Sequence, residues 1–159
     1  AFQSASRGNE YVERFFQLLE AGWTENARVL VRRGDWSASL EGSCALISHF
    51  TPGRLVLGNL GDCRAILVSE GADGRLEAQQ LTHEHNASRP EERIRVLKEH
   101  PDEPDAVQYI PKSGSWYVKG TLQVTRAIGD LFLKDGWFHN SLPNHVRPYV
   151  GGQVPAQTD

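Results

Sequence analysis

The sequence predicts an α+β fold, and three observations carry that prediction. Apolar residues recur at helical spacing near the start of the chain, four short strand-like runs follow with tight connections, and a second helical pattern comes after them. A chain of 159 residues is long enough for one hydrophobic core. We therefore expect one domain, or part of one, in which helices flank antiparallel strands.

The first expected element is an amphipathic helix over residues 9–21. Five apolar residues recur there at helical spacing: Tyr11, Val12, Phe15, Leu18 and Leu19. Gly22 follows as a C-terminal stop. Residues 27–33 would either continue the helix or begin a strand, and the pattern does not decide between the two.

Four strands are expected next, paired in order as an antiparallel meander. Their apolar runs cover residues 44–50, 55–60, 63–69 and 76–81. Glycine-bearing turns separate the runs, among them Gly58-Asn59-Leu60-Gly61-Asp62. On this interpretation Asp62 lies at the tip of a hairpin between two largely buried strands. Gly58 and Gly61 would allow positive φ or a close backbone approach there.

A second helix is expected from Ser88 to about His100. Ser88-Arg89-Pro90-Glu91 matches a capping box, in which the Ser hydroxyl and the Glu carboxylate each satisfy a free backbone N–H. Ile94 and Leu97 are expected to form its buried stripe, with its charged residues, Glu92 included, in water.

The rest of the chain is expected to contain two short strands, at 116–118 and 122–125, and then to become irregular. The acidic segment 102–105 is expected to be a solvated surface loop. Several prolines and glycines within residues 135–159 block any long element.

Composition argues against several classes of partner. A net charge of −3 gives no electrostatic footprint for nucleic acid or an anionic membrane. No apolar run approaches the roughly 18 residues that a membrane span requires, so a soluble protein is expected. The two cysteines, Cys44 and Cys63, form no disulfide framework, which favours a reducing intracellular compartment, cytoplasmic or nuclear, with the mitochondrion as an alternative. Each is expected to be a buried structural thiol.

Two segments are candidate sites when taken alone. Asp62 is most simply a turn residue that bonds to its own backbone. In His83-Glu84-His85, the two imidazoles lie on one side of an extended segment, as in some transition-metal sites. Because a metal site needs further ligands and no cluster follows at a telling spacing, a structural pair is favoured. The sequence has no nucleotide-binding glycine loop, serine-hydrolase elbow or zinc-protease helix motif.

Three segments in order resemble one known family. They are Leu57-Gly58-Asn59-Leu60-Gly61-Asp62-Cys63-Arg64-Ala65, Leu81-Thr82-His83-Glu84-His85-Asn86 and Lys119-Gly120-Thr121-Leu122-Gln123-Val124-Thr125-Arg126-Ala127-Ile128-Gly129-Asp130. Together they resemble the middle of the metal-dependent protein serine/threonine phosphatase domain, the type 2C or PPM family. Gly42-Ser43-Cys44-Ala45 resembles the family's entry to the preceding strand, so the match runs from about Gly42 to Lys134. The segment after His85 is similar to the pyruvate dehydrogenase phosphatase branch and to one group of plant members.

The resemblance implies an α/β/β/α sandwich of two antiparallel sheets. It also implies that residues 1–159 form a single incomplete domain of this kind, with the family motifs within residues 42–134. It also implies Mg²⁺ or Mn²⁺ bound by carboxylates and water, a metal-bound hydroxide that attacks phosphoserine or phosphothreonine, and a phosphoprotein substrate. Hard oxygen ligands suit these cations, which lower the pKa of bound water and offset phosphoryl charge.

Most of the family's metal-ligand motifs have no counterpart in this sequence, namely the early Glu-Asp pair, Asp-Gly-His-Gly-Gly, the later Asp-Gly-x-x-Asp and the closing Asp-Asn. Asp62 aligns with a position that in some members helps to hold an additional metal ion. Gly61, Arg126, Gly129 and Asp130 match positions where structural roles near the site are expected. Arg126 and Asp130 are expected to form a partly buried Arg–carboxylate pair.

The leading hypothesis is a parent protein that is a Mg²⁺- or Mn²⁺-dependent serine/threonine phosphatase. The chain begins on Ala1-Phe2 and contains no Met, and we interpret it as the central part of that protein, inactive alone. The alternative is a catalytically dead phosphatase-like module that binds partners. A third hypothesis, a zinc-dependent hydrolase, would use His83 and His85.

Overall fold

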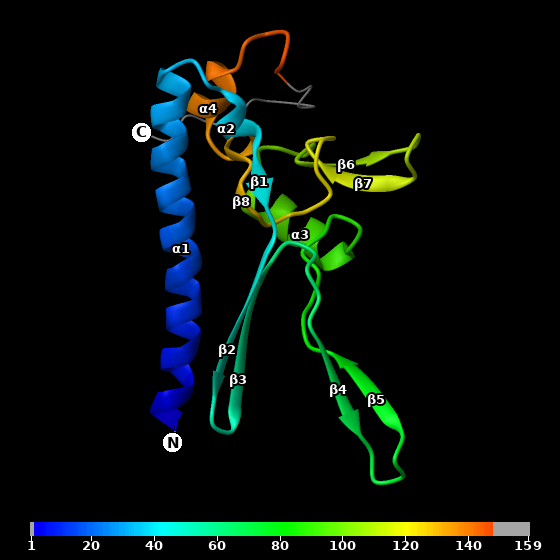
Figure 1. Ribbon diagram of the computed structural model, residues 1–159. Coiled ribbons are helices and arrows are strands. Elements are labelled where there is room, and N and C mark those ends of the chain that lie inside the picture. Colours follow the sequence, from blue (N-terminus) through cyan, green and yellow to red (C-terminus); the bar gives the residue numbers. More distant parts are fainter. Residues whose placement is uncertain (1, 148–159) are drawn as a thin grey trace.

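The computed structural model describes residues 2–147 of the chain, and side chains from residue 10 onward (Figure 1). The helices are α1 (Phe2–Arg32), α2 (Ser37–Leu40), α3 (Pro90–Glu99), the 3₁₀ helix η1 (Leu131–Leu133) and α4 (Gly136–Ser141). The strands are β1 (Gly42–Ser43), β2 (Ala45–Thr51), β3 (Arg54–Leu60), β4 (Ile66–Glu70), β5 (Leu76–Gln80), β6 (Val107–Ile110), β7 (Ser115–Val118) and β8 (Ile128–Gly129). Helices accompanied by antiparallel strand pairs confirm the α+β class.

Helix α1 is far longer than the sequence predicts and continues through Gly22 to Arg32. A helical glycine costs about 1 kcal/mol relative to alanine, and packing after Gly22 offsets that cost. Ala27 belongs to a buried cluster with Ala38, Leu131 and Phe138, which ties the C-terminal part of α1 to α2, η1 and α4. The expected stop at Gly22 is therefore wrong, and residues 27–32 are helical. No helix within residues 2–147 is long and apolar enough to cross a membrane.

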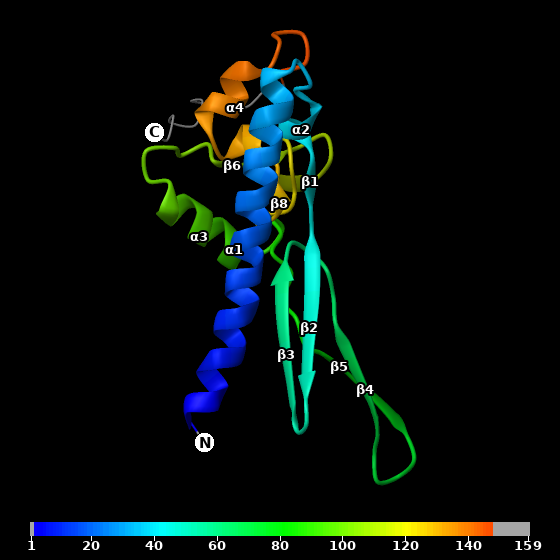
Figure 2. The same ribbon diagram turned by 60° about the vertical axis from the view of Figure 1, so that its left-hand side comes forward.

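The strands form four separate antiparallel pairs in the described part of the chain, instead of a four-stranded meander. The expected hairpins β2–β3 and β4–β5 are present, and both extend away from the central region (Figures 1 and 2). However, β3 and β4 belong to different pairs. The backbone between them bonds instead to the segment after β5, because Leu81 N–H donates to Ala65 O and His85 N–H donates to Gly61 O. Asp62 thus lies in a connection between two hairpins, and its predicted place at a hairpin tip is wrong.

Helix α3 begins at Pro90, and its expected capping box is absent. Arg89 occupies the N-cap position without a side-chain cap, and Ser88 N–H donates to Asn86 Oδ1. Pro90 starts the helix because its missing N–H is not needed in the first turn. The helix is also rotated relative to the expectation, since Val96 is buried while Ile94 is 66% exposed.

The second half of the chain contains two strands that the sequence pattern did not indicate, β6 and β8. Strand β6 pairs with the expected β7, whereas the expected strand at 122–125 makes only isolated bridges. The acidic segment before β6 is not simply solvated. Lys119, whose side chain is 5% exposed, places Nζ 2.5 Å from Glu103 Oε2 and 3.4 Å from Asp105 Oδ1. The irregular region after residue 134 also contains the short helix α4, while residues 148–159 lie outside the described part.

Candidate functional site around the Asp62 connection

The connection that carries Asp62 is held in place by a tightly packed glycine. Gly61 has φ of +86°, a conformation that side-chain-bearing residues rarely adopt. A Cβ at this position would overlap the Cys44 side chain and come within 3.3 Å of Arg126 O. Gly61 therefore brings three distant parts of the chain together at one point, with the exposed Asp62 carboxylate beside them.

Both carboxylate oxygens of Asp62 are contacted by side chains from other segments. Asn86 Nδ2 donates to Oδ2 at 3.3 Å, and Cys44 Sγ lies 3.5 Å from Oδ1. Burial raises the pKa of the Cys44 thiol, so the thiol stays protonated and serves as the donor. Asp62 therefore bonds across the fold, in contrast to the simple interpretation of a turn aspartate. Cys44 and Cys63 are both partly exposed rather than buried.

A short ladder of backbone bonds joins the three segments that resemble the phosphatase motifs. His85 N–H donates to Gly61 O at 2.9 Å, and Thr125 N–H donates to His85 O at 2.9 Å. One residue further on, Asn86 bridges to Val124. The segment around His85 thus lies between the Asp62 connection and the segment around Thr125, so that motifs far apart in sequence form one site.

Glu92 of α3 anchors the outer segment of this ladder. Its side chain is only 8% exposed. It accepts hydrogen bonds from Arg126 Nη2 at 2.8 Å, Arg95 Nη2 at 3.0 Å and Thr125 Oγ1 at 2.5 Å. Burial alone would raise the pKa of Glu92, but these three donors outweigh it and lower the pKa from 4.5 to about 2. Glu92 is therefore ionised and forms ion pairs with both arginines next to the site, of which Arg95 also pairs with Glu99.

This arrangement corrects the expected Arg126–Asp130 pair. Arg126 does form a partly buried ion pair, but with Glu92. Asp130 instead has φ of +50°, and its backbone N–H donates to Glu41 O at 2.8 Å. Burial raises the pKa of the Asp130 carboxyl. Sequence reasoning missed Glu92 because it placed that residue on the solvent face of α3; the signal that could have found it is Val96, one helical turn along the same face.

The two histidines lie in different environments. His83 is exposed, whereas His85 is partly buried and its Nδ1 has no hydrogen-bond partner among the described residues. Burial and then the nearby Arg126 lower the pKa of His85, so its imidazole is neutral at pH 7.

A divalent cation requires several oxygen, nitrogen or sulfur ligands close together. Within residues 2–147 no group of three or more His, Cys, Asp and Glu side chains is arranged to hold one. Asp62 alone offers a single carboxylate, and its oxygens already face an amide and a thiol. These residues therefore do not fit a divalent cation by themselves, and the zinc hypothesis for His83 and His85 gains no further ligand. The role of Asp62 as a metal ligand stays a prediction, as do the structural roles of the residues near it.

The ionised Glu92 carboxylate and its three donors are expected to stabilise the fold less in acid. A carboxyl with a lowered folded-state pKa stabilises the fold above its unfolded-state pKa, here 4.5, and that contribution disappears as the pH falls towards 2. Between pH 5 and pH 2, we expect the free energy of unfolding to fall by on the order of 3 kcal/mol more in the native chain than in Glu92→Gln. Urea unfolding across this range measures the difference; parallel pH profiles for the two proteins would contradict the assignment.

Comparisons with known proteins agree with the three motif segments. The family model described as protein phosphatase 2C matches residues 12–155. "Probable protein phosphatase 2C 43" of Oryza sativa subsp. japonica is 43% identical over 128 residues, which cover 79% of this chain and 31% of that protein. "Probable protein phosphatase 2C 64" of Arabidopsis thaliana is 37% identical over 132 residues, covering 82% and 32%. The chain spans about a third of the length of these curated relatives. They are plant proteins, and the likeness to the pyruvate dehydrogenase phosphatase branch is not confirmed.

Proposed function

This chain belongs to the protein phosphatase 2C family, and from that membership we propose that it is the central part of a domain that hydrolyses phosphoserine and phosphothreonine in proteins. The family match over residues 12–155 is the observation that carries the proposal. The structure supports it because the Asp62 connection, the His85 segment and the Arg126 segment meet at one site. A phosphoprotein substrate and an intracellular location stay predictions.

The proposed reaction uses Mg²⁺ or Mn²⁺, which would supply an activated water and offset charge on the phosphoryl oxygens. Asp62 is the ligand that the family resemblance assigns, and since no group of three or more ligands exists within residues 2–147, the proposal takes the remaining ligands from polypeptide outside them. The chain's own contribution is to position Asp62 through Asn86 and the backbone of His85, and to hold Arg126 against Glu92. We therefore expect the 159 residues alone to show no turnover.

A chimera tests this proposal. The 128 matched residues of the rice relative 2C 43 would be replaced by the matching residues of this chain. We expect the chimera to hydrolyse a phosphothreonine peptide with Mn²⁺, and EDTA to abolish the reaction. The unmodified rice protein, assayed in parallel, shows whether the conditions support turnover.

The alternative, a catalytically dead module that binds partners, is distinguished by the same assay. It predicts a folded chimera, with cooperative thermal unfolding like that of the rice protein, but without metal-dependent turnover. Such a result beside an active rice protein would overturn the phosphatase proposal.

A further inference from the structure

The histidine of helix α4 is enclosed by the fold. His139 is 2% exposed, and its ring donates a hydrogen bond to the backbone carbonyl of Phe132 in η1. The ring nitrogen Nδ1 has no partner among the described residues, so the donor is Nε2 and the imidazole is the neutral Nε2–H tautomer. Nδ1 is therefore a buried acceptor without a donor.

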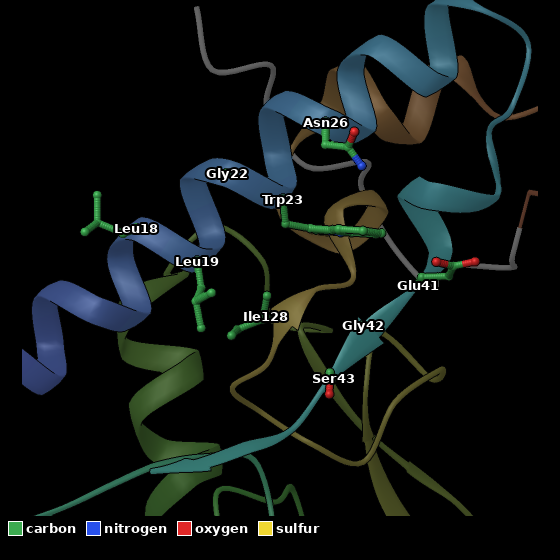
Figure 3. A pocket seen from close by; sticks show the side chains of 9 residues that line it. All are labelled: Leu18, Leu19, Gly22, Trp23, Asn26, Glu41, Gly42, Ser43 and Ile128. Carbon is green, nitrogen blue, oxygen red and sulfur yellow. The ribbon is translucent and has the colours of Figure 1, made fainter. Parts of the chain in front are cut away.

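The main groove of the described structure does not reach this imidazole. That groove has a volume of about 540 Å³ and lies between α1 and the β1–β8 pair, with Leu18, Trp23 and Ile128 in its walls (Figure 3). None of the residues that line it belongs to α4 or to the segment after α4. The groove therefore brings no water to Nδ1, and a proton taken up there would lie in a buried place.

Arg147 folds back onto the end of α4 and holds residues 143–147, which we call the clasp. Its Nη2 donates to Leu142 O at 3.0 Å and to Asn140 O at 3.3 Å. Carbonyls at the end of a helix have no partner within the helix, so these two bonds fasten the clasp to α4. Within the clasp, Arg147 N–H donates to Pro143 O at 3.0 Å.

The charge of Arg147 acts on the buried imidazole. Burial and then Arg147 lower the pKa of His139 below its usual 6.5. A protonated ring would carry a second N–H, at Nδ1, with no acceptor among the described residues, and a positive charge near the guanidinium. The closed clasp therefore favours the neutral imidazole.

The charged groups on the elements around α4 do not offset this effect. They are Arg28 and Arg32 of α1, Lys134 after η1, Asp135 at the N-cap of α4 and the exposed His145 of the clasp, while α2 carries none. Asp135, the carboxylate of this set, is paired with Arg28 at 3.4 Å. Within residues 2–147, no carboxylate acts on His139 to favour its protonated form.

We propose that His139 makes the clasp an acid-sensitive latch, closed on α4 while the imidazole is neutral and released when it takes up a proton at Nδ1. Release would uncover Leu142, which is 2% exposed in the closed form. It would also free the two carbonyls to which Arg147 donates. The latch requires neither a metal ion nor phosphatase turnover, so its failure is separate from failure of the proposed function.

Acid should open the clasp. In the open form the imidazole titrates near its usual pKa of 6.5, so the closed form binds fewer protons as the pH falls below 6.5. The stabilisation of the closed form is complete above pH 6.5. Below it, the ratio of open to closed form should rise about tenfold for each pH unit, until the pH reaches the lowered pKa of the closed form.

Hydrogen exchange of the Leu142 amide in the 159-residue chain tests the latch, because this amide donates to His139 O at 3.3 Å. Its protection factor, corrected for the intrinsic effect of pH on exchange, should fall about tenfold from pH 6.5 to pH 5.5. The amides of the β2–β3 hairpin, at the other end of the molecule (Figure 1), should keep their protection.

Two variants separate His139 from other titrating groups. His139→Gln keeps an N–H donor for Phe132 O but does not titrate, so the fall at Leu142 should disappear. His49→Gln changes an exposed histidine of β2 and is the matched control, in which the fall should persist. The ¹⁵N shifts of the His139 ring in the native chain need no variant, and should show a protonated Nε2 and a titration midpoint below pH 6.5.

A His139 ring that titrates at or above pH 6.5 would overturn the proposal. An equal fall at Leu142 in His139→Gln would also overturn it, because another group would then control the clasp. A matching fall in the β2–β3 amides would do the same, since the whole chain would be unfolding in place of the clasp.

Discussion

Replacing Glu92 by alanine is expected to lower the free energy of unfolding by about 3 kcal/mol. The change leaves Arg126 and Arg95 without their shared carboxylate, and leaves Thr125 Oγ1 without its acceptor. Breaking a buried ion pair by removing one partner costs about 3–5 kcal/mol, and the lower end applies because both arginines are partly exposed. Urea unfolding at pH 7 measures the loss.

The neighbouring Glu91 is a matched control, because it lies on the same helix with an exposed side chain. Glu91→Ala should cost no more than about 1 kcal/mol, the usual contribution of an acidic residue in the first turn of a helix. Equal losses for the two variants would show that Glu92 is an ordinary surface residue.

Replacing Gly129 by alanine is the second change with a large expected effect. Gly129 has φ of +78°, and a Cβ there would overlap the carbonyl oxygen of Glu41. Left-handed backbone costs an alanine about 1 kcal/mol, and the overlap with a rigid backbone atom adds about 1–3 kcal/mol. We expect a total loss of about 3 kcal/mol, with separation of β1 from β8.

Gly53 isolates the steric part of this effect. It also has positive φ, +73°, but a Cβ there would meet no atom within 4 Å. Gly53→Ala should therefore cost only the conformational part, about 1 kcal/mol. If both alanine variants unfold at the same urea concentration, the overlap with Glu41 O adds nothing to the loss of stability in Gly129→Ala.

Local sequence features predicted two of the hairpins, β2–β3 and β4–β5. The β2–β3 hairpin follows from apolar runs joined by Pro52-Gly53, because the turn chemistry lies within four residues. The pairing of β3 with β4 failed, since a bond between distant residues, His85 N–H to Gly61 O, competes for the same backbone. Long-range pairing of this kind leaves no mark in the turn residues themselves.

The candidate site could be predicted only in part, because its contacts also join residues that are distant in the sequence. Motif spacing identified Asp62 and Arg126, and the structure brings their segments together. Glu92 and Lys119 escaped notice because charged residues are usually exposed. Glu92 bonds to Thr125 and Arg126, which lie 33 and 34 residues further along the chain. Lys119 pairs with Asp105, 14 residues before it. Only the folded chain shows that these charges are neutralised internally.

We propose that this chain is the central part of a metal-dependent protein phosphatase domain. The most direct test is the initial rate of phosphothreonine hydrolysis by the chimera as Mn²⁺ is titrated, with the rice protein and the 159-residue chain measured beside it. We expect a saturable rise in the rate for the chimera and the rice protein, full loss with EDTA, and no rate for the chain alone. A folded chimera that stays inactive at every Mn²⁺ concentration at which the rice protein turns over would contradict the claim.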